Sequence, residues 1–171
     1  RVHERTDSLR EIGAGIYLKR NGLDVLKKLG VFERLRPEAE RLTAGEIRGE
    51  NDTLLIARDF SGEDVFTVLR GALHEALAEA ARAAGAEILT GSAVEGANAD
   101  GELMLAGGRR TKADLVIGAD GVRSVVRESL GLTRRCVDLP DGAIRLLIER
   151  RPHDLPGTTY EHWSREYRMG L

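Results

Sequence analysis

Cysteine is almost absent from this chain of 171 residues, which carries Cys136 alone. A single cysteine excludes an intrachain disulfide framework and fits a reducing compartment, so we expect a cytoplasmic protein. The chain starts at Arg1 without an initiator methionine or a recognisable secretory signal. We therefore expect the natural N-terminus to lie upstream.

Several other features are missing, and each absence removes a class of function. No apolar run approaches the roughly 20 residues of a membrane-spanning helix, so no membrane role is expected. The four histidines, at positions 3, 74, 153 and 162, are scattered, and no metal-ligand spacing is visible. The net charge of −2 shows no basic excess, so no nucleic-acid partner is expected.

What is present indicates a globular α/β domain. Apolar residues make up 42% of the chain and charged residues 32%, which is ordinary for such a domain. Apolar periodicity predicts helices around residues 25–29 and 68–85, with Thr67 as an N-cap and Gly30 and Gly85 as stops. Residues 44–66, 86–89 and 143–150 read as strands, and residues 93–108 as a hairpin that turns near Asp100. Strands alternating with helices predict a mainly parallel sheet.

The segment ADLVIGADGVRSVVRESLG, residues 113–131, is the most informative. Leu115 to Ile117 read as a strand buried on both faces, followed by a helix that Gly131 closes. Such a strand delivers Asp120 and Gly121 to the sheet edge where α/β proteins bind ligands. From spacing alone, Asp120 is either a hydrogen-bond acceptor for a ligand or a cap of the following helix.

This segment resembles the second fingerprint of the FAD-dependent aromatic hydroxylases, the class A flavoprotein monooxygenases. Three further segments agree in order: VHER, LREIGAGIYL and VLRGALHEAL. The resemblance implies a partial Rossmann-like FAD-binding domain with β-hairpin insertions. It also implies cofactor-binding roles for the following residues: Glu4, Arg5, Arg10, Arg70, Val94, Asp120 and Gly121.

The segments GAGIYL, GAIRLLIER and YEHWSREYR look closest to the subgroup that contains 2-methyl-3-hydroxypyridine-5-carboxylate oxygenase. That likeness implies a substrate-binding role for Tyr17 and for Arg168. Each has a plainer alternative, a packed aromatic for Tyr17 and a surface charge for Arg168.

The resemblance implies an enzyme that uses FAD, NADH or NADPH as reductant, and O₂. It would hydroxylate a small aromatic or N-heteroaromatic substrate through a flavin C4a-hydroperoxide. No catalytic acid or base stands out, so the catalytic residues are unknown. Alternatives are a halogenase or reductase of the same fold, a non-catalytic fragment, and, more remotely, an NAD-dependent dehydrogenase.

Two family landmarks fall outside the chain: the first strand with its GxGxxG loop, and the GD segment. We therefore expect residues 1–135 to form a partial FAD-binding domain and residues 136–171 to begin a substrate-binding β-sheet region. The missing strand would leave sheet edges exposed, so self-association is expected. The bias toward arginine over lysine suggests a bacterial source.

Overall fold

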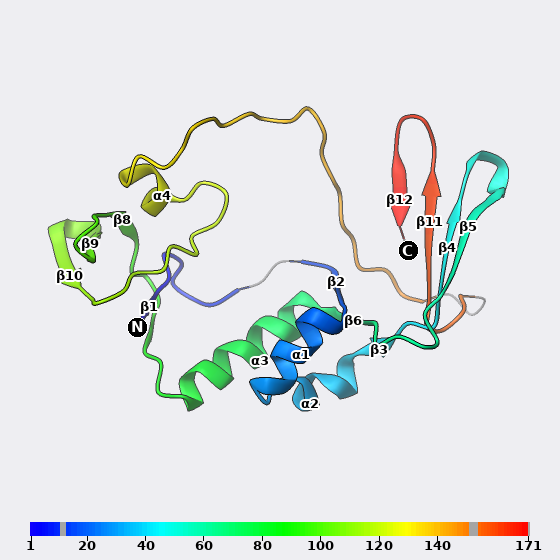
Figure 1. Cartoon of the computed structure of the whole chain (residues 1–171), viewed down its shortest axis with the longest axis horizontal. Helices are drawn as coiled ribbons and strands as arrows, with labels where there is room; N and C mark the ends of the chain where they lie inside the picture. Colours follow the sequence, from blue (N-terminus) through cyan, green and yellow to red (C-terminus); the bar gives the residue numbers. More distant parts are fainter. Residues whose placement is uncertain (11–12, 151–153, 171) are drawn as a thin grey trace. The chain divides into compact units, whose positions relative to one another are not determined.

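The computed structural model describes residues 1–10, 13–150 and 154–170, and these form two compact units (Figure 1). The first unit comprises Arg1–Arg10 and Arg82–Ile144, and the second comprises Glu11–Ala81 and Arg145–Leu171. The domain boundary expected at residue 135 stays a prediction.

The strands and helices follow one another in a mixed α/β order. The first unit contains β1 (Val2–His3), β7 (Ile88–Leu89), β8 (Val94–Ala97), β9 (Glu102–Leu105), β10 (Arg109–Lys112) and α4 (Val125–Ser129). The second contains β2 (Gly15–Leu18), α1 (Arg20–Lys28), α2 (Phe32–Leu35), β3 (Glu40–Arg41), β4 (Ala44–Arg48), β5 (Leu54–Asp59), β6 (Phe66–Leu69), most of α3 (Arg70–Ala83), β11 (Thr158–Trp163) and β12 (Arg168–Gly170). Short 3₁₀ segments lie at Arg36–Glu38, Glu50–Asp52 and Ala106–Gly108.

The α/β class is confirmed, but the expectation of a mainly parallel sheet is not met. Among the described strands, β1 pairs with β7 and β4 with β11 in parallel, and the other pairings are antiparallel. The second unit holds the sheets β12-β11-β4-β5 and β2-β6-β3. Antiparallel neighbours predominate because short turns join most of these strands, and such turns cannot make parallel crossovers.

The hairpin expected at residues 93–108 is confirmed in the first unit, where β8 and β9 pair antiparallel. The Asn98 side-chain oxygen accepts hydrogen bonds from the backbone N–H groups of Asp100 and Glu102, at 3.0 and 3.1 Å. Gly101 has a φ of +78°, which suits glycine. β10 adds a third strand that the sequence did not predict.

The helix α1 packs one face against the second unit's core. Val25, Leu26 and Leu29 recur at helical spacing in the sequence, but the structure buries Leu23 and Leu26 and leaves Val25 and Leu29 exposed. Gly30 ends the helix as predicted: its φ is +70°, and its N–H donates to the carbonyl of Lys27. Lys27 and Lys28 lie in the last turn, where positive charge favours the helix dipole.

The long helix expected at residues 68–85 is confirmed as α3, with a later start. Thr67 is not its N-cap, because Thr67 lies inside β6 and pairs with Tyr17 of β2. The strand runs directly into the helix at Arg70. Gly85, with a φ of +85°, ends it as predicted.

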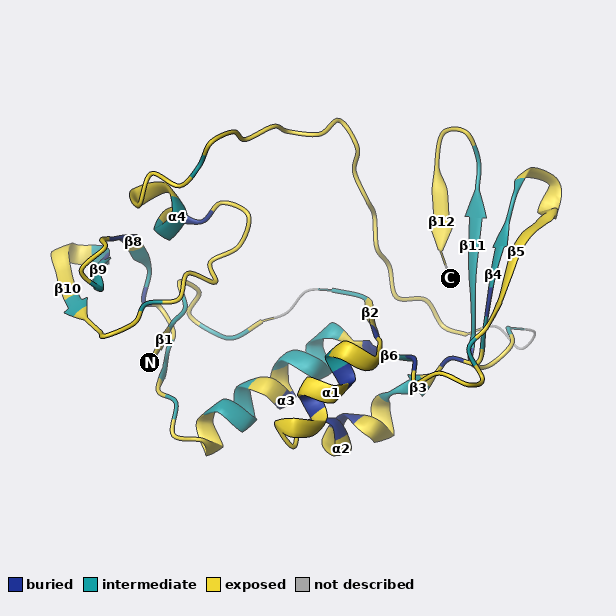
Figure 2. Ribbon diagram, viewed as in Figure 1, coloured by how far each residue is buried: buried dark blue, intermediate teal, exposed yellow. Residues whose placement is uncertain are grey.

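The core of the second unit lies between these helices and the β2-β6-β3 sheet. Its buried members are Leu18, Leu23, Leu26, Val31, Phe32, Leu35, Val68 and Ala76. Figure 2 shows the buried positions gathered on α1 and α2. Phe32 and Phe66 meet edge to face with ring centroids 5.3 Å apart, a favoured aromatic geometry.

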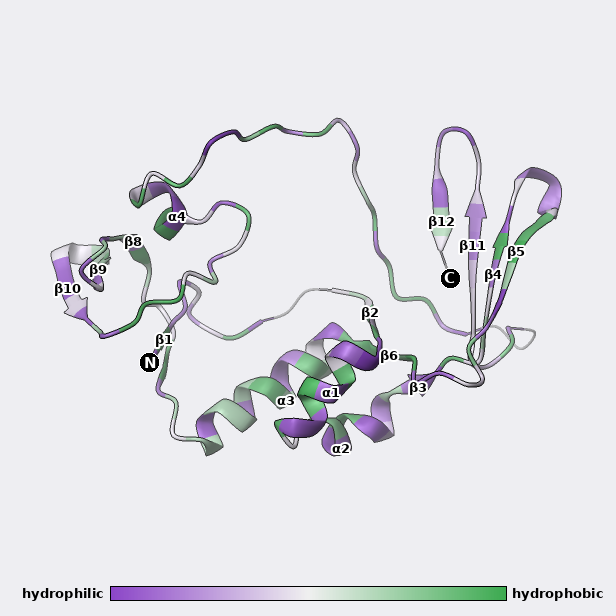
Figure 3. Cartoon of the chain, viewed as in Figure 1, coloured by the Kyte–Doolittle hydropathy of each residue, from purple (hydrophilic) through white to green (hydrophobic). Residues whose placement is uncertain are grey.

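Two predicted strands do not form. Residues 115–117 and 143–150 have no regular structure, and Leu115, Ile117 and Ile144 are 74%, 79% and 90% exposed. Figure 3 shows hydrophobic residues along the extended stretch after α4. A buried strand needs neighbours on both sides, and no described strand lies beside either segment. No helix in the described part of the chain has the length and apolarity to cross a membrane.

Substitutions at two positions of α1 should differ sharply in their effect on the free energy of unfolding. Leu23 is fully buried, so Leu23→Ala should lower the free energy of unfolding by about 2–5 kcal/mol through lost burial and a residual cavity. Val25 is 54% exposed, so Val25→Ala should change it by no more than about 0.5 kcal/mol. Urea denaturation followed by far-ultraviolet circular dichroism measures both. Equal effects would show that α1 does not pack through Leu23.

Candidate functional site

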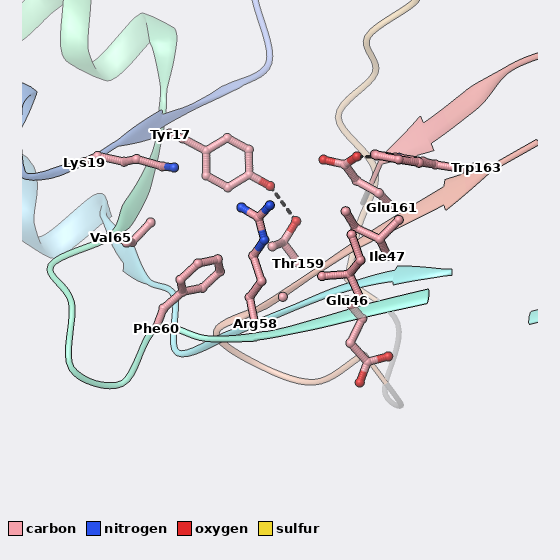
Figure 4. A pocket seen from close by; sticks show the side chains of 12 residues that line it. Tyr17, Lys19, Glu46, Ile47, Arg58, Phe60, Val65, Thr159, Glu161 and Trp163 are labelled. Carbon is pink, nitrogen blue, oxygen red and sulfur yellow. Dashed lines mark hydrogen bonds between the residues drawn. The ribbon is translucent and has the colours of Figure 1, made fainter. Parts of the chain in front are cut away.

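A pocket of about 310 Å³ lies in the second unit, over one face of the sheet that contains β4, β5 and β11 (Figure 4). Its lining residues are Tyr17, Lys19, Gly45, Glu46, Ile47, Ile56, Arg58, Phe60, Val65, Thr159, Glu161 and Trp163. Apolar and aromatic walls with a few polar groups are typical of small-molecule sites.

Strand alternation explains which side chains face this pocket. Successive residues of a strand point to opposite faces, so Thr159, Glu161 and Trp163 of β11 share one face. Glu46, between two pocket-facing residues of β4, points to the opposite side in Figure 4. Its carboxylate is held there by Arg48 at 2.6 Å. Glu46 therefore contributes little charge to the pocket.

Tyr17 stands at the border of the pocket, on β2. Its hydroxyl and the Thr159 hydroxyl are 2.5 Å apart, a short hydrogen bond between residues 142 positions apart in sequence. The side chain is 49% exposed, so Tyr17 is not the fully packed core aromatic of the alternative interpretation. An exposed aromatic ring with a polar tip suits contact with a ligand.

Arg168 does not line the pocket but touches a residue that does. Its guanidinium carbon lies 4.3 Å from the centroid of the Trp163 ring, a cation–π contact across the β11-β12 pair. The Trp163 ring nitrogen donates to the Glu161 carboxylate at 2.8 Å. Arg168 therefore helps to fix the Trp163 wall.

Glu4, the first of the expected cofactor residues, follows β1 in the first unit. One carboxylate oxygen accepts hydrogen bonds from the backbone N–H and hydroxyl of Thr6, at 2.8 and 2.9 Å. The Thr6 backbone N–H, followed by its hydroxyl, lowers the pKa of Glu4 below the ordinary value. Glu4 is thus ionised at neutral pH, and its second oxygen can accept hydrogen bonds from sugar hydroxyls.

The other expected cofactor residues differ in exposure. Arg5 and Arg10 are exposed, and Arg10 donates from Nε to the Ser8 hydroxyl at 2.9 Å. Val94 is half-buried at the start of β8. Arg70 belongs to the second unit, where its backbone N–H donates to the Ala14 carbonyl at 3.1 Å at the start of α3. Arg70 thus falls in the second unit, and the other six expected cofactor residues fall in the first.

Asp120 supports the start of α4, whose N-cap residue is Ser124. One carboxylate oxygen accepts from the Ser124 hydroxyl at 2.5 Å and the other from the Val126 N–H at 3.2 Å. The Ser124 hydrogen bond is the main cause of a lowered pKa for Asp120. Gly121 next to it has a φ of +84° and open space around its Cα, so backbone can approach a ligand there.

The sequence did not identify Gly45, Arg58 or Trp163 as site residues. Arg58 two residues after Ile56 in β5 is a weak signal, because the spacing puts a charge on the same face as an apolar residue. In the described ranges, no group of three His, Cys, Asp or Glu side chains could hold a metal ion.

Comparison with known families gives one extensive match. The model of the FAD binding domain family matches residues 2–166. A 2-heptyl-3-hydroxy-4(1H)-quinolone synthase of Mycobacteroides abscessus is 38% identical over 160 residues, which are 92% of this chain and 43% of that protein. A 3-amino-4-hydroxybenzoate 2-monooxygenase of Streptomyces cremeus is 37% identical over 139 residues, 76% of this chain and 35% of that protein.

Among solved structures, a tetrameric form of 2-methyl-3-hydroxypyridine-5-carboxylic acid oxygenase is similar, with a TM-score of 0.89 and 35% identity. The match covers 97% of this chain and 46% of that one. The chain thus spans less than half the length of these relatives.

The cap on α4 predicts a pH-dependent contribution to stability. Asp120→Ala removes the bonds to Ser124 and Val126, so it should lower the stability of the first unit by about 0.5–1 kcal/mol at pH 7. Because the folded pKa of Asp120 is lowered, the difference should persist down to about pH 4 and fade below it, as the native carboxylate protonates. Urea denaturation from pH 7 to pH 3 measures it, with the exposed Asp114→Ala as control. A difference that stays constant to pH 3 contradicts the cap.

Proposed function

The chain belongs to the FAD binding domain family, and from this premise we propose that it is part of an FAD- and NAD(P)H-dependent monooxygenase that hydroxylates an aromatic or N-heteroaromatic substrate. The observation that carries the proposal is the pocket that Tyr17 borders, with apolar and aromatic walls of a size for one small ring system. The hydroxybenzoate and hydroxypyridine oxygenases among its relatives support it.

Residues of the first unit have the chemistry to hold the adenosine and phosphate parts of FAD. Glu4 presents an ionised carboxylate for ribose hydroxyls, and Arg5 and Arg10 present exposed guanidinium groups for phosphate oxygens. Gly121 leaves room for close approach, with Asp120 beside it. Val94, also in the first unit, belongs to the proposed set, and the cofactor role of Arg70, in the second unit, stays a prediction. When bound, FAD would take electrons from NADH or NADPH and activate O₂ for transfer of one oxygen atom to the ring.

In the second unit the chain's own residues would bind and orient the substrate. The Tyr17 hydroxyl can donate to or accept from a ring substituent, and Thr159 fixes its position. Trp163, held by Glu161 and Arg168, offers a flat wall for an aromatic ring. Ile47, Ile56 and Val65 would supply apolar contacts for the ring. Cellular location and self-association stay predictions.

Flavin uptake tests the proposal directly. We expect the purified chain to show flavin absorbance, or to gain it when FAD is added, and to release FAD on denaturation. Glu4→Gln should weaken FAD binding about tenfold or more, because a charged acceptor for hydroxyl groups is lost. Glu95→Gln, an exposed carboxylate on β8, is the matched control. Absence of FAD binding at micromolar concentration in the complete enzyme that contains this chain would overturn the proposal.

Loss of the Tyr17 hydroxyl should selectively weaken substrate binding. In the complete enzyme, Tyr17→Phe should weaken binding of the aromatic substrate about threefold to tenfold, because a hydroxyl hydrogen bond is lost. Arg168→Ala should act in the same direction by loosening Trp163. Substrate titration and NAD(P)H oxidation with O₂ uptake measure both effects. Tyr160→Phe is the control, since Tyr160 does not line the pocket. The role of both residues fails if affinity and turnover match the wild type.

A further inference from the structure

Gly45 lies in the floor of the pocket, on a strand that is paired on both sides. It is aligned with Thr159 of β11 on one side of β4 and with Arg58 of β5 on the other. A glycine inside a strand weakens it, because glycine has no side chain to pack and loses the most conformational freedom on folding. The backbone gives no reason for glycine here, since the φ of Gly45 lies outside the left-handed region. The reason therefore lies in the space that a side chain would fill.

That space is bordered closely by two other lining residues. A Cβ at position 45 would lie 2.9 Å from the Cε2 atom of Phe60 and 3.2 Å from the methyl group of Thr159. Both distances are shorter than the separation of about 3.5–4.0 Å at which carbon atoms attract one another best. The Phe60 ring can lie against this part of β4 only because position 45 has no side chain.

Phe60 could answer a larger residue at position 45 only by moving its side chain. Its backbone is held at both ends: its N–H donates to the Thr43 carbonyl, and its carbonyl accepts from the Glu63 N–H, each at 2.8 Å. Figure 4 shows the ring on the Tyr17 side of β4 and β5. A ring displaced from Gly45 would therefore move into the pocket, because the strand backbone closes the other side.

The volume of the pocket indicates the size of ligand that this arrangement admits. The pocket encloses about 310 Å³. At roughly 30 Å³ for each water molecule in the liquid, it has room for about ten water molecules, and so for about ten non-hydrogen atoms of a ligand. Two fused six-membered rings have about that number of atoms, whereas a single ring would leave much of the volume unfilled. The side chains of Ile47, Ile56 and Trp163 offer apolar contact to such a flat ring system.

We propose that Gly45 determines substrate specificity by ring size. With the Phe60 ring lying against Gly45, the pocket admits two fused aromatic rings, and a side chain at position 45 would restrict it to one. This assignment rests on the proposed function and deepens it, because it names the substrate class as fused two-ring aromatic or heteroaromatic compounds. Gly45 contributes open space, and no covalent step is assigned to it.

Affinity for a matched pair of ligands tests the assignment. The complete enzyme that contains this chain is titrated with 3-hydroxypyridine and with 3-hydroxyquinoline, which adds one fused ring to the same hydroxypyridine. Calorimetry or ligand-observed NMR measures both dissociation constants. The wild type should bind 3-hydroxyquinoline about tenfold or more tightly, because the second ring buries additional apolar surface. Gly45→Ala should weaken 3-hydroxyquinoline binding about tenfold to a hundredfold through overpacking, and should change 3-hydroxypyridine binding less than about threefold.

Further variants separate loss of room from general damage. Gly45→Ala combined with Phe60→Leu removes the ring atoms nearest the new methyl group, so it should recover most of the lost affinity for 3-hydroxyquinoline. Gly49→Ala is the matched control: a Cβ there would lie 3.3 Å from Leu55, but Gly49 does not line the pocket, so both affinities should match the wild type. If circular dichroism shows that Gly45→Ala is unfolded, Ile47→Phe narrows the pocket from the same strand and should give the same selective loss.

Three results would each contradict the assignment. The first is a wild type that binds the two ligands equally or does not bind 3-hydroxyquinoline, the second is an equal loss of both affinities in Gly45→Ala, and the third is no recovery in the double variant. Flavin content and NAD(P)H oxidation, measured on the same samples, distinguish these results from failure of the proposed function. Selectivity for ring size can be absent from an enzyme that binds FAD and oxidises NAD(P)H, whereas a wild type that binds no FAD defeats the proposed function itself.

Discussion

The parallel pairing of β4 with β11 is the interaction on which the candidate substrate pocket depends. It joins residues 44–48 to residues 158–162, more than a hundred positions apart. Gly157 starts the pairing: its carbonyl accepts from the Thr43 N–H and its own N–H donates to Glu40, each bond under 3 Å. Its φ is +66°, and a Cβ there would lie 2.9 Å from the Arg41 carbonyl. A side chain at this point would push the two strands apart.

The sequence predicted the elements whose ends are set by local chemistry. Gly30 and Gly85 close α1 and α3 as expected, because a positive φ favours glycine wherever it occurs. The start of α3 was misplaced because pairing of Thr67 with Tyr17 overrides a favourable capping residue. The apolar run at 115–117 was interpreted as a buried strand, but burial requires neighbouring strands that the described chain does not supply.

The candidate site, like the fold, could be predicted from the sequence only in part. Resemblance pointed to Tyr17, and the structure places it at a pocket. No pattern in the sequence pointed to Arg58 or Gly45, because their importance comes from register: Thr159, Gly45 and Arg58 align only when three strands far apart in the chain pair in one particular way. From the sequence, Asp120 was either a hydrogen-bond acceptor for a ligand or a cap of α4. Its bonds to Ser124 and Val126 show the capping contact, and the ligand-binding role stays a prediction.

The long sequence separation between β4 and β11 has a consequence for the order of folding. Closing a loop of that length costs conformational entropy that local helices and hairpins do not incur, so the helical core should assemble before the pocket. A region that forms last also opens most readily, with a lower free energy of local unfolding than the core. A ligand that contacts β4, β5 and β11 would then stabilise the pairing of these strands. It would slow the exchange of β11 amide hydrogens more than the exchange of those of α1.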